Sequence, residues 1–185
     1  MARTLHLIKH GCPHIVPGTP AHDWALAQNA LEGLHVLADR LFPPPGLVVS
    51  SEEPKAIATA EALARILNVP RRRMLGLHEH LRYTTAFVSP EVFQAQVQRF
   101  FLEPDVLVMG EESATDARTR FRNAIHAVMQ GNPYGCVAVV AHGTVISLLA
   151  EEMGGTDPTA LWRSLDFLGH VSLAWPEVAL REPPA

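Results

Sequence analysis

Lysine, cysteine and basic charge are all scarce in this chain of 185 residues. The two cysteines, Cys12 and Cys136, are too few for a disulfide framework and lack the spacing of a zinc site, so we expect a reduced, intracellular protein. The formal net charge of −4 lacks the basic excess that binding to nucleic acids or anionic membranes requires. We therefore expect neither as a partner, and any anion site must be a local basic pocket.

Long hydrophobic runs are also missing. No apolar run approaches the roughly 18–20 residues of a membrane span, and His6, Lys9 and His10 interrupt the first apolar stretch too early for a signal peptide. We therefore expect a cytoplasmic protein. The 48% hydrophobic and 18% charged content is typical of a globular chain rather than a disordered one. The length predicts a single domain over residues 1–175, followed by a proline-rich tail at residues 176–185.

Apolar segments of strand length alternate along the chain with segments of helical period. Strands are expected at residues 4–8, 47–49, 74–77, 137–141 and 171–175. Helices are expected at residues 31–41, 54–67, 113–129 and 143–153, with another beginning at Ser89-Pro90. The run Arg71–Arg73 is interpreted as a solvated turn or as an outer guide for a charged substrate. This alternation predicts an α/β fold, a three-layer α/β/α sandwich with a mostly parallel central sheet.

Three motifs follow directly on predicted strands. His10, Ser51 and His142 each lie just past the carboxyl end of a strand, at the edge where open α/β sheets bind ligands. The chain contains only two lysines, Lys9 and Lys55, beside thirteen arginines, and both lysines lie in the first two of these motifs. A neutral imidazole can attack phosphorus and hold it covalently, while ammonium groups neutralise phosphoryl oxygens. The pattern therefore predicts a phosphate pocket with a histidine nucleophile.

Five motifs occur in order along the chain. They are Leu7-Ile8-Lys9-His10-Gly11, Ser50-Ser51-Glu52-Glu53-Pro54-Lys55-Ala56 with Thr59-Ala60, Leu77-His78-Glu79, Gly110-Glu111-Glu112-Ser113 and Val140-Ala141-His142-Gly143. Together they resemble the histidine phosphatase superfamily, in the branch that contains the cofactor-dependent phosphoglycerate mutases and the small phosphatases similar to them. The resemblance extends from residue 4 to about residue 149 and implies a phosphoglycerate mutase-like fold.

The resemblance implies catalytic roles for three residues. His10 matches the nucleophile that becomes phosphohistidine, and His142 matches the second histidine, which stabilises the transferring phosphoryl group. Glu79 falls where the family places its proton donor. The residues themselves leave this last assignment open, because Glu111 or Glu112 could supply the acid instead.

Four further residues are expected to bind the substrate. Lys9 and Lys55 stand where the family usually has arginine, so both charges remain but the planar fork that grips two phosphate oxygens is lost. Gly11 and Gly143 let the backbone turn sharply, and helices starting after the strand-end motifs would point free N–H groups at the ligand. Cys12, with the proline after it, replaces a small polar pair that often helps to hold phosphate in the family.

These residues predict a metal-independent phosphomonoester hydrolase that acts on a small phosphorylated metabolite through a phosphohistidine, with no cofactor. Mutase activity is not expected, because the long insertion of a mutase is not recognisable. The alternative is a catalytically weak or inactive phosphatase-like protein that binds a phosphorylated ligand or partner. A third hypothesis, a metal-dependent hydrolase, depends on the spacing of His6, His10 and His14, but a strand entering a loop does not place them on one face. The sequence does not fix the oligomeric state, and a homodimer is compatible with it.

Overall fold

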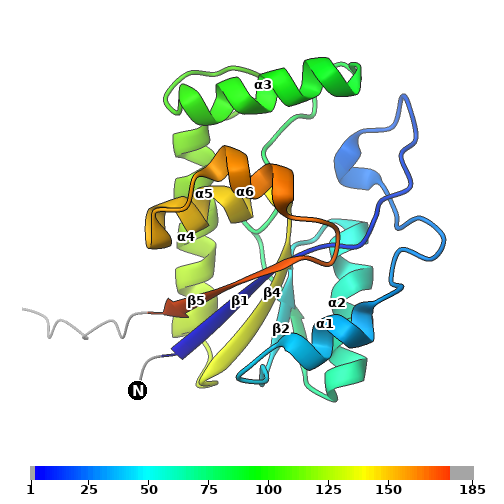
Figure 1. Ribbon diagram of the computed structural model, residues 1–185, viewed down its shortest axis with the longest axis vertical. Coiled ribbons are helices and arrows are strands. Elements are labelled where there is room, and N and C mark those ends of the chain that lie inside the picture. Colours follow the sequence, from blue (N-terminus) through cyan, green and yellow to red (C-terminus); the bar gives the residue numbers. More distant parts are fainter. Residues whose placement is uncertain (1–2, 176–185) are drawn as a thin grey trace, which may run out of the picture.

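The structure is a computed structural model that describes residues 3–175 (Figure 1). In chain order its elements are β1 (Arg3–Lys9), the 3₁₀ helix η1 (Ala21–Asp23), α1 (Leu34–Arg40), β2 (Val48–Ser50), α2 (Pro54–Leu67), β3 (Arg71–Arg73), α3 (Pro90–Leu102), α4 (Ala114–Gln130), β4 (Cys136–Ala141), α5 (Gly143–Gly154), α6 (Pro158–Ser164) and β5 (His170–Trp175). Among the described residues, no helix is long and apolar enough to cross a membrane. The expected proline-rich tail at residues 176–185 lies outside the described residues.

One five-stranded sheet has the order β3-β2-β4-β1-β5. β1, β2, β3 and β4 run parallel to one another, and β5 runs antiparallel to β1, so the predicted mostly parallel sheet is confirmed. The register aligns Lys9 with Ala141 and Ser50 with Val140. The carboxyl ends of β1, β2 and β4 therefore finish together at one edge of the sheet, which is where the sequence motifs begin.

Helices cover both faces of this sheet, as the alternation of elements predicted (Figure 1). Side chains of successive strand residues point to opposite faces, and the two faces form separate hydrophobic cores. Leu7 of β1 and Val139 of β4 pack in the core formed with α3, α4, α5 and α6. Ile8 and Val140, each the next residue along its strand, pack in the core formed with α1 and α2. The fold is thus a three-layer α/β/α sandwich.

Helix starts follow the local signals in the sequence. Ser113 accepts a hydrogen bond from the backbone N–H of Asp116, and the Asp116 carboxylate reciprocates, which confirms the capping box at the start of α4. Ser89 caps α3 by accepting a hydrogen bond from the backbone N–H of Val92, ahead of a proline in the first turn. No helix follows Gly11, however, because residues 11–20 run as an irregular loop. The predicted helix from residue 31 begins only at Leu34, after Gly33 in the left-handed conformation.

The prediction of a strand at residues 74–77 was wrong. The strand is β3, Arg71–Arg73, which pairs with β2 alone and forms one border of the sheet. All three arginine side chains are exposed, because an edge strand of three residues has little buried face to fill. The expected solvated turn at these residues is thus also corrected. Sequence periodicity missed this strand because it contains no apolar residue, and it missed α6 as well.

Candidate active site

Two histidines meet at the carboxyl edge of the sheet. His10 follows β1 and His142 follows β4, and their ring centroids lie 5.0 Å apart. The His10 amide donates a hydrogen bond to the carbonyl of Ala141, so it extends the pairing of β1 with β4 by one residue. Both side chains are buried. Two residues that are 132 positions apart in the sequence (142 − 10) are therefore held against each other by the strand register.

The His10 imidazole has one free nitrogen. Its Nδ1 lies 2.7 Å from the carbonyl oxygen of Gly11, which can only accept, so Nδ1 carries the proton and Nε2 keeps its lone pair. The pKa of His10 is lowered to about 4, mainly by burial and also by the nearby charge of Lys55, against the effect of the Gly11 hydrogen bond. His10 is therefore neutral at pH 7 and fits the requirements of a nitrogen nucleophile.

His142 is fully buried and faces two oxygen atoms. Its Nε2 lies 2.8 Å from the hydroxyl oxygen of Ser51 and 3.3 Å from Oε1 of Glu53. Burial holds the pKa of His142 well below its ordinary value, and the neighbouring His10 adds to this effect. Since a carboxylate can only accept, the contact with Glu53 favours a proton on Nε2. Nδ1 of His142 has no hydrogen-bond partner among the described residues.

The two lysines also reach this edge, but each is already engaged. Lys9 donates from Nζ to the carbonyl oxygen of Leu165 at 2.7 Å, and its Nζ lies 4.7 Å from the ring centroid of Phe167. Lys55 is buried, forms an ion pair with Glu53 and donates to the carbonyl oxygen of Ala21 at 2.7 Å. An ammonium group has three donors, so Lys9 retains two N–H groups and Lys55 one.

The two motif glycines differ in what they provide. A Cβ on Gly11 would lie 2.6 Å from the carbonyl oxygen of Ala30, so only glycine fits there. The Gly11 N–H donates to the Thr59 hydroxyl at 3.0 Å and is therefore committed to a protein contact. Gly143 begins α5, and a Cβ there would lie 3.6 Å from Nζ of Lys9. The absence of a side chain at Gly143 thus leaves space beside a charged group of the site.

Glu79 is attached to the same edge by backbone groups. Its carboxylate accepts hydrogen bonds from the N–H of His80 at 2.8 Å and from the N–H of Thr144, in the first turn of α5, at 3.2 Å. Burial by itself would raise the pKa of Glu79. The charge of Arg82 and the His80 hydrogen bond outweigh this effect, and the pKa is lowered overall. Glu79 is thus ionised at neutral pH in these surroundings.

The two alternative acids lie in a different environment. Glu111 accepts hydrogen bonds from the backbone N–H groups of Tyr83 and Thr84, both at 2.9 Å. Glu112 accepts from the N–H of Leu81 at 3.0 Å and forms an ion pair with Arg120. Both glutamates therefore hold the loop that follows Glu79 in place. Their hydrogen bonds connect them to this loop and to α4 rather than to the histidine pair.

Glu53 belongs to the site although the sequence analysis did not select it. One oxygen contacts Nζ of Lys55, and the other accepts from the N–H of Glu79 at 2.8 Å and lies near His142. Glu53 occupies the N-cap position of α2 without capping it through its side chain. The only signal in the sequence was an acidic residue two positions before Lys55, and a helix start usually explains such a residue.

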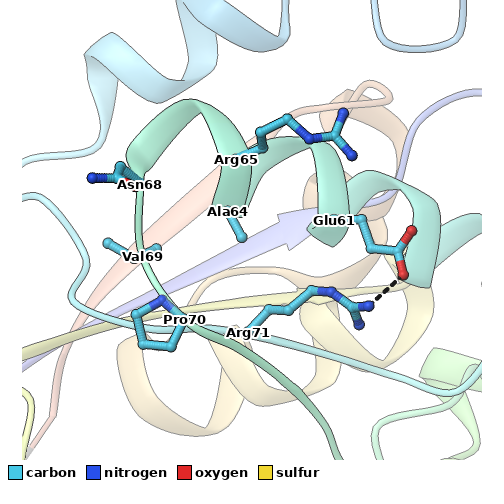
Figure 2. A pocket seen from close by; sticks show the side chains of 7 residues that line it. All are labelled: Glu61, Ala64, Arg65, Asn68, Val69, Pro70 and Arg71. Carbon is cyan, nitrogen blue, oxygen red and sulfur yellow. Dashed lines mark ion pairs between the residues drawn. The ribbon is translucent and has the colours of Figure 1, made fainter.

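Hollows on the protein include a smaller one near the carboxyl edge of the sheet and a larger one at the end of α2. The smaller, of about 300 Å³, adjoins the site and is lined by His22, Asp23, Glu52, Glu53, Pro54, Met74, Leu75, Gly76, His78 and Tyr83. The larger, of about 560 Å³, lies where α2 ends and β3 begins, and Figure 2 shows its lining residues with the ion pair between Glu61 and Arg71. The smaller hollow is the one next to the candidate site, because Glu53 lines it and also lies near His142.

No three histidine, cysteine, aspartate or glutamate side chains within residues 3–175 are grouped as metal ligands. His6, one of the histidines that suggested a metal site, contacts the Ser172 hydroxyl through Nδ1 and the Pro43 carbonyl through Nε2, at 2.7 and 3.0 Å. These contacts join β1 to β5 and to the segment between α1 and β2. The metal-dependent hypothesis therefore has no candidate site in the described part of the chain.

The structure thus places a neutral histidine pair and two ammonium groups at the carboxyl edge of a mostly parallel α/β sheet. The chain matches the family model described as histidine phosphatase superfamily (branch 1) over residues 5–176. It therefore belongs to this superfamily and is by class a phosphoric monoester hydrolase. The resemblance found in the sequence motifs is confirmed.

Solved structures with the same fold include three phosphatases. The native structure of a mycobacterial glucosyl-3-phosphoglycerate phosphatase is 22% identical with a TM-score of 0.72, covering 93% of this chain and 90% of its own. The α-ribazole phosphatase from Shigella flexneri is 20% identical with a TM-score of 0.67, covering 91% and 89%. A phosphoserine phosphatase mutant from Entamoeba histolytica, in complex with phosphoserine, is 17% identical with a TM-score of 0.69, covering 91% and 89%. No curated protein sequence matches the chain.

Proposed function

We propose that the protein hydrolyses a small phosphomonoester through a phosphohistidine on His10, without a metal ion or cofactor. The observation that carries this proposal is the His10 imidazole, which is neutral and has its Nε2 lone pair free beside His142 and two lysines. The three phosphatases of solved structure compared above are named for phosphorylated small molecules. That agreement supports a small metabolite as the substrate class.

The proposed reaction has two displacements. Nε2 of His10 attacks phosphorus, the ester P–O bond breaks with its electron pair on oxygen, and Glu79 protonates the departing alcohol. Water then attacks the phosphohistidine, giving its proton to Glu79 while the N–P bond pair returns to Nε2. Glu79 must be protonated before the first step. A dianionic phosphate close to Glu79 raises the pKa of this carboxyl by charge repulsion, which supplies that proton only when substrate is bound.

The cations and His142 would stabilise the transferring phosphoryl group. Lys9 keeps two N–H groups for phosphoryl oxygens, and the Gly143 backbone beside it leaves room for them. Lys55 adds charge close enough to act on both histidines. Phosphoryl transfer depends mainly on positioning and on neutralising charge. Two lysines in place of arginine forks give charge with less geometric control, so we expect moderate rather than high turnover.

Hydrolysis of p-nitrophenyl phosphate in EDTA tests this proposal. Wild type should turn over, while His10→Ala should lose at least 1000-fold in kcat/KM, because the nucleophile of a covalent mechanism is removed. The matched control is His35→Ala, at an exposed histidine on α1, which should keep wild-type activity. Lys9→Arg/Lys55→Arg should raise kcat/KM. Activity that EDTA abolishes, or that persists in His10→Ala, would contradict the proposal.

A second function is favoured by one observation. Lys55 already has two protein partners, Glu53 and the Ala21 carbonyl, which reduces its ability to neutralise a phosphoryl group. A pocket of this kind would suit a protein that binds a phosphorylated ligand or partner without turning it over. Phosphate binding without any phosphohistidine, in wild type and in the double arginine variant, would establish this alternative.

A further inference from the structure

Glu53 makes three contacts that a substrate phosphate would be expected to make. Its carboxylate is ion-paired with Lys55, lies 3.3 Å from Nε2 of His142 and accepts the backbone N–H of Glu79 at 2.8 Å. The side chain is only 8% exposed, so these contacts replace hydration rather than supplement it. It stands at the N-cap of α2 but makes no side-chain hydrogen bond to that helix. The Glu53 carboxylate therefore interacts with the candidate site at the carboxyl edge of the sheet, and not with its own helix.

The charges of the pocket lead to the same conclusion. Lys9 and Lys55 bring two positive charges, and both histidines are neutral at pH 7 because their pKa values are lowered. Glu53 and Glu79 bring two negative charges. Arg82 also acts on Glu79. A phosphate dianion that enters the pocket would nevertheless meet the Glu53 carboxylate on Lys55, the cation that should bind the phosphate. Like charges this close cannot both remain in a low-dielectric site without a large cost.

We propose, on the basis of the function proposed above, that the Glu53 carboxylate holds the place of the phosphoryl group in the empty site and is displaced when a phosphomonoester binds. Phosphate then takes over the contacts with Lys55 and His142, replacing a monoanion with a dianion. Glu53 is thus a residue that determines affinity and specificity, since every substrate must compete with it. Removing its charge should strengthen phosphate binding.

The hollow beside the site can receive the displaced Glu53 carboxylate, and the charge of that hollow then determines which substrates fit. Glu53 lines the hollow of about 300 Å³ beside the site, together with Asp23 and Glu52. When Glu53 turns toward this hollow, it joins Asp23 and Glu52, so that three carboxylates line the space that we assign to the alcohol part of the ester. An anionic alcohol part would be repelled there. The protein should therefore prefer phosphomonoesters whose alcohol part is uncharged or cationic.

Calorimetric titration with inorganic phosphate tests the displacement. Glu53→Gln should bind phosphate at least tenfold more tightly than wild type. The control Glu61→Gln makes the same change on the same helix, at the exposed ion pair with Arg71 in Figure 2, and should bind like wild type. Unchanged or weaker phosphate binding by Glu53→Gln would overturn the proposal, because Glu53 would then only position Lys55.

Wild type itself offers a measurement that does not depend on a variant folding. A crystal structure of wild type with inorganic phosphate should show phosphate on Lys55 with the Glu53 carboxylate turned away. Phosphate bound beside an intact pair of Glu53 and Lys55 would overturn the proposal. Glu53→Ala is a second variant in which binding should also strengthen at least tenfold.

Kinetics separate this proposal from the proposed function. Wild type should favour phosphoethanolamine and glycerol 3-phosphate over 3-phosphoglycerate at least tenfold in kcat/KM, and Glu53→Gln should narrow that ratio. An unchanged ratio would overturn the assigned substrate class. If neither protein hydrolyses any ester while Glu53→Gln still binds phosphate more tightly, the hydrolase proposal fails and the role of Glu53 stands.

Discussion

At the residue scale, the lowered pKa values of the two buried histidines make the free energy of unfolding depend on pH. Burial lowers the pKa of His10 to about 4 from an ordinary value of 6.5. Between these two values the unfolded chain binds a proton on this residue that the folded chain does not. Stability therefore rises with pH across this window and is lost as pH falls through it. His142 acts in the same direction.

We expect His10→Asn to reduce this acid sensitivity. A difference of about 2.5 pKa units corresponds to roughly 3 kcal/mol of unfolding free energy between pH 6.5 and 4. Urea unfolding of wild type and His10→Asn at pH 7 and 4.5 measures the effect. The loss in wild type should exceed that in the variant by about 2–3 kcal/mol, and His35→Ala should lose as much as wild type. Equal losses in all three proteins would show that His10 is protonated in the folded state.

The sequence predicted the two histidines of this site. It did not predict the residues whose role depends on the direction in which their side chains point. His10 and His142 could be found because a strand end fixes where the next residue lies. Glu53 could not, because an acidic residue at a helix start usually faces its own helix, and here it faces the catalytic edge instead. Phe167, whose ring centroid lies 5.8 Å from that of His10, was also missed because it follows a helix that the sequence did not reveal.

At the scale of elements, α4 positions the loop that carries Glu79. Arg120 on α4 donates to the carbonyl oxygens of Gly76, His78 and Glu79, and it forms an ion pair with Glu112. One guanidinium therefore fixes several backbone groups of a segment that has no regular structure. The proposed acid, Glu79, is thus held in position by Arg120, which lies 41 residues further along the chain.

Arg120→Ala should therefore impair both stability and turnover. Removing one partner of a largely buried ion pair costs about 3 kcal/mol, and a displaced Glu79 should lower kcat by roughly tenfold to hundredfold. KM should change little, because the phosphate contacts remain. Arg122→Ala, on the same helix, breaks only the surface pair with Glu152 and should cost less than about 1 kcal/mol. If KM rose while kcat fell in Arg120→Ala, Arg120 would have a general structural role instead.

At the scale of the whole molecule, the site exists because of the sheet order. β4 lies between β2 and β1, so motifs from the beginning, the first third and the last third of the chain end side by side. The alternation of strands and helices predicted the layers, but the order of the strands could not be obtained from one sequence. β3 was the least predictable strand, because it depends on a single partner strand and presents only exposed arginines. The other edge strand, β5, was predicted at residues 171–175.

Gly11 shows how tightly this arrangement constrains the carboxyl edge of the sheet. It follows His10 directly, and a Cβ there would lie 2.6 Å from the Ala30 carbonyl oxygen, in the segment before α1. Backbone cannot yield as a flexible side chain does, so Gly11→Ala must push the end of β1 away from that segment. We expect a loss of about 1–3 kcal/mol in stability and a marked fall in kcat/KM, because His10 moves with its neighbour.

Gly135→Ala is the matched control for this change. A Cβ on Gly135 would meet no heavy atom within 4 Å, and the residue directly precedes β4. Its stability and activity should stay close to wild type. Thermal unfolding and p-nitrophenyl phosphate hydrolysis of both variants measure the two effects together. If Gly11→Ala were as stable and active as Gly135→Ala, the close packing between β1 and the segment before α1 would not be what holds His10 in its reactive position.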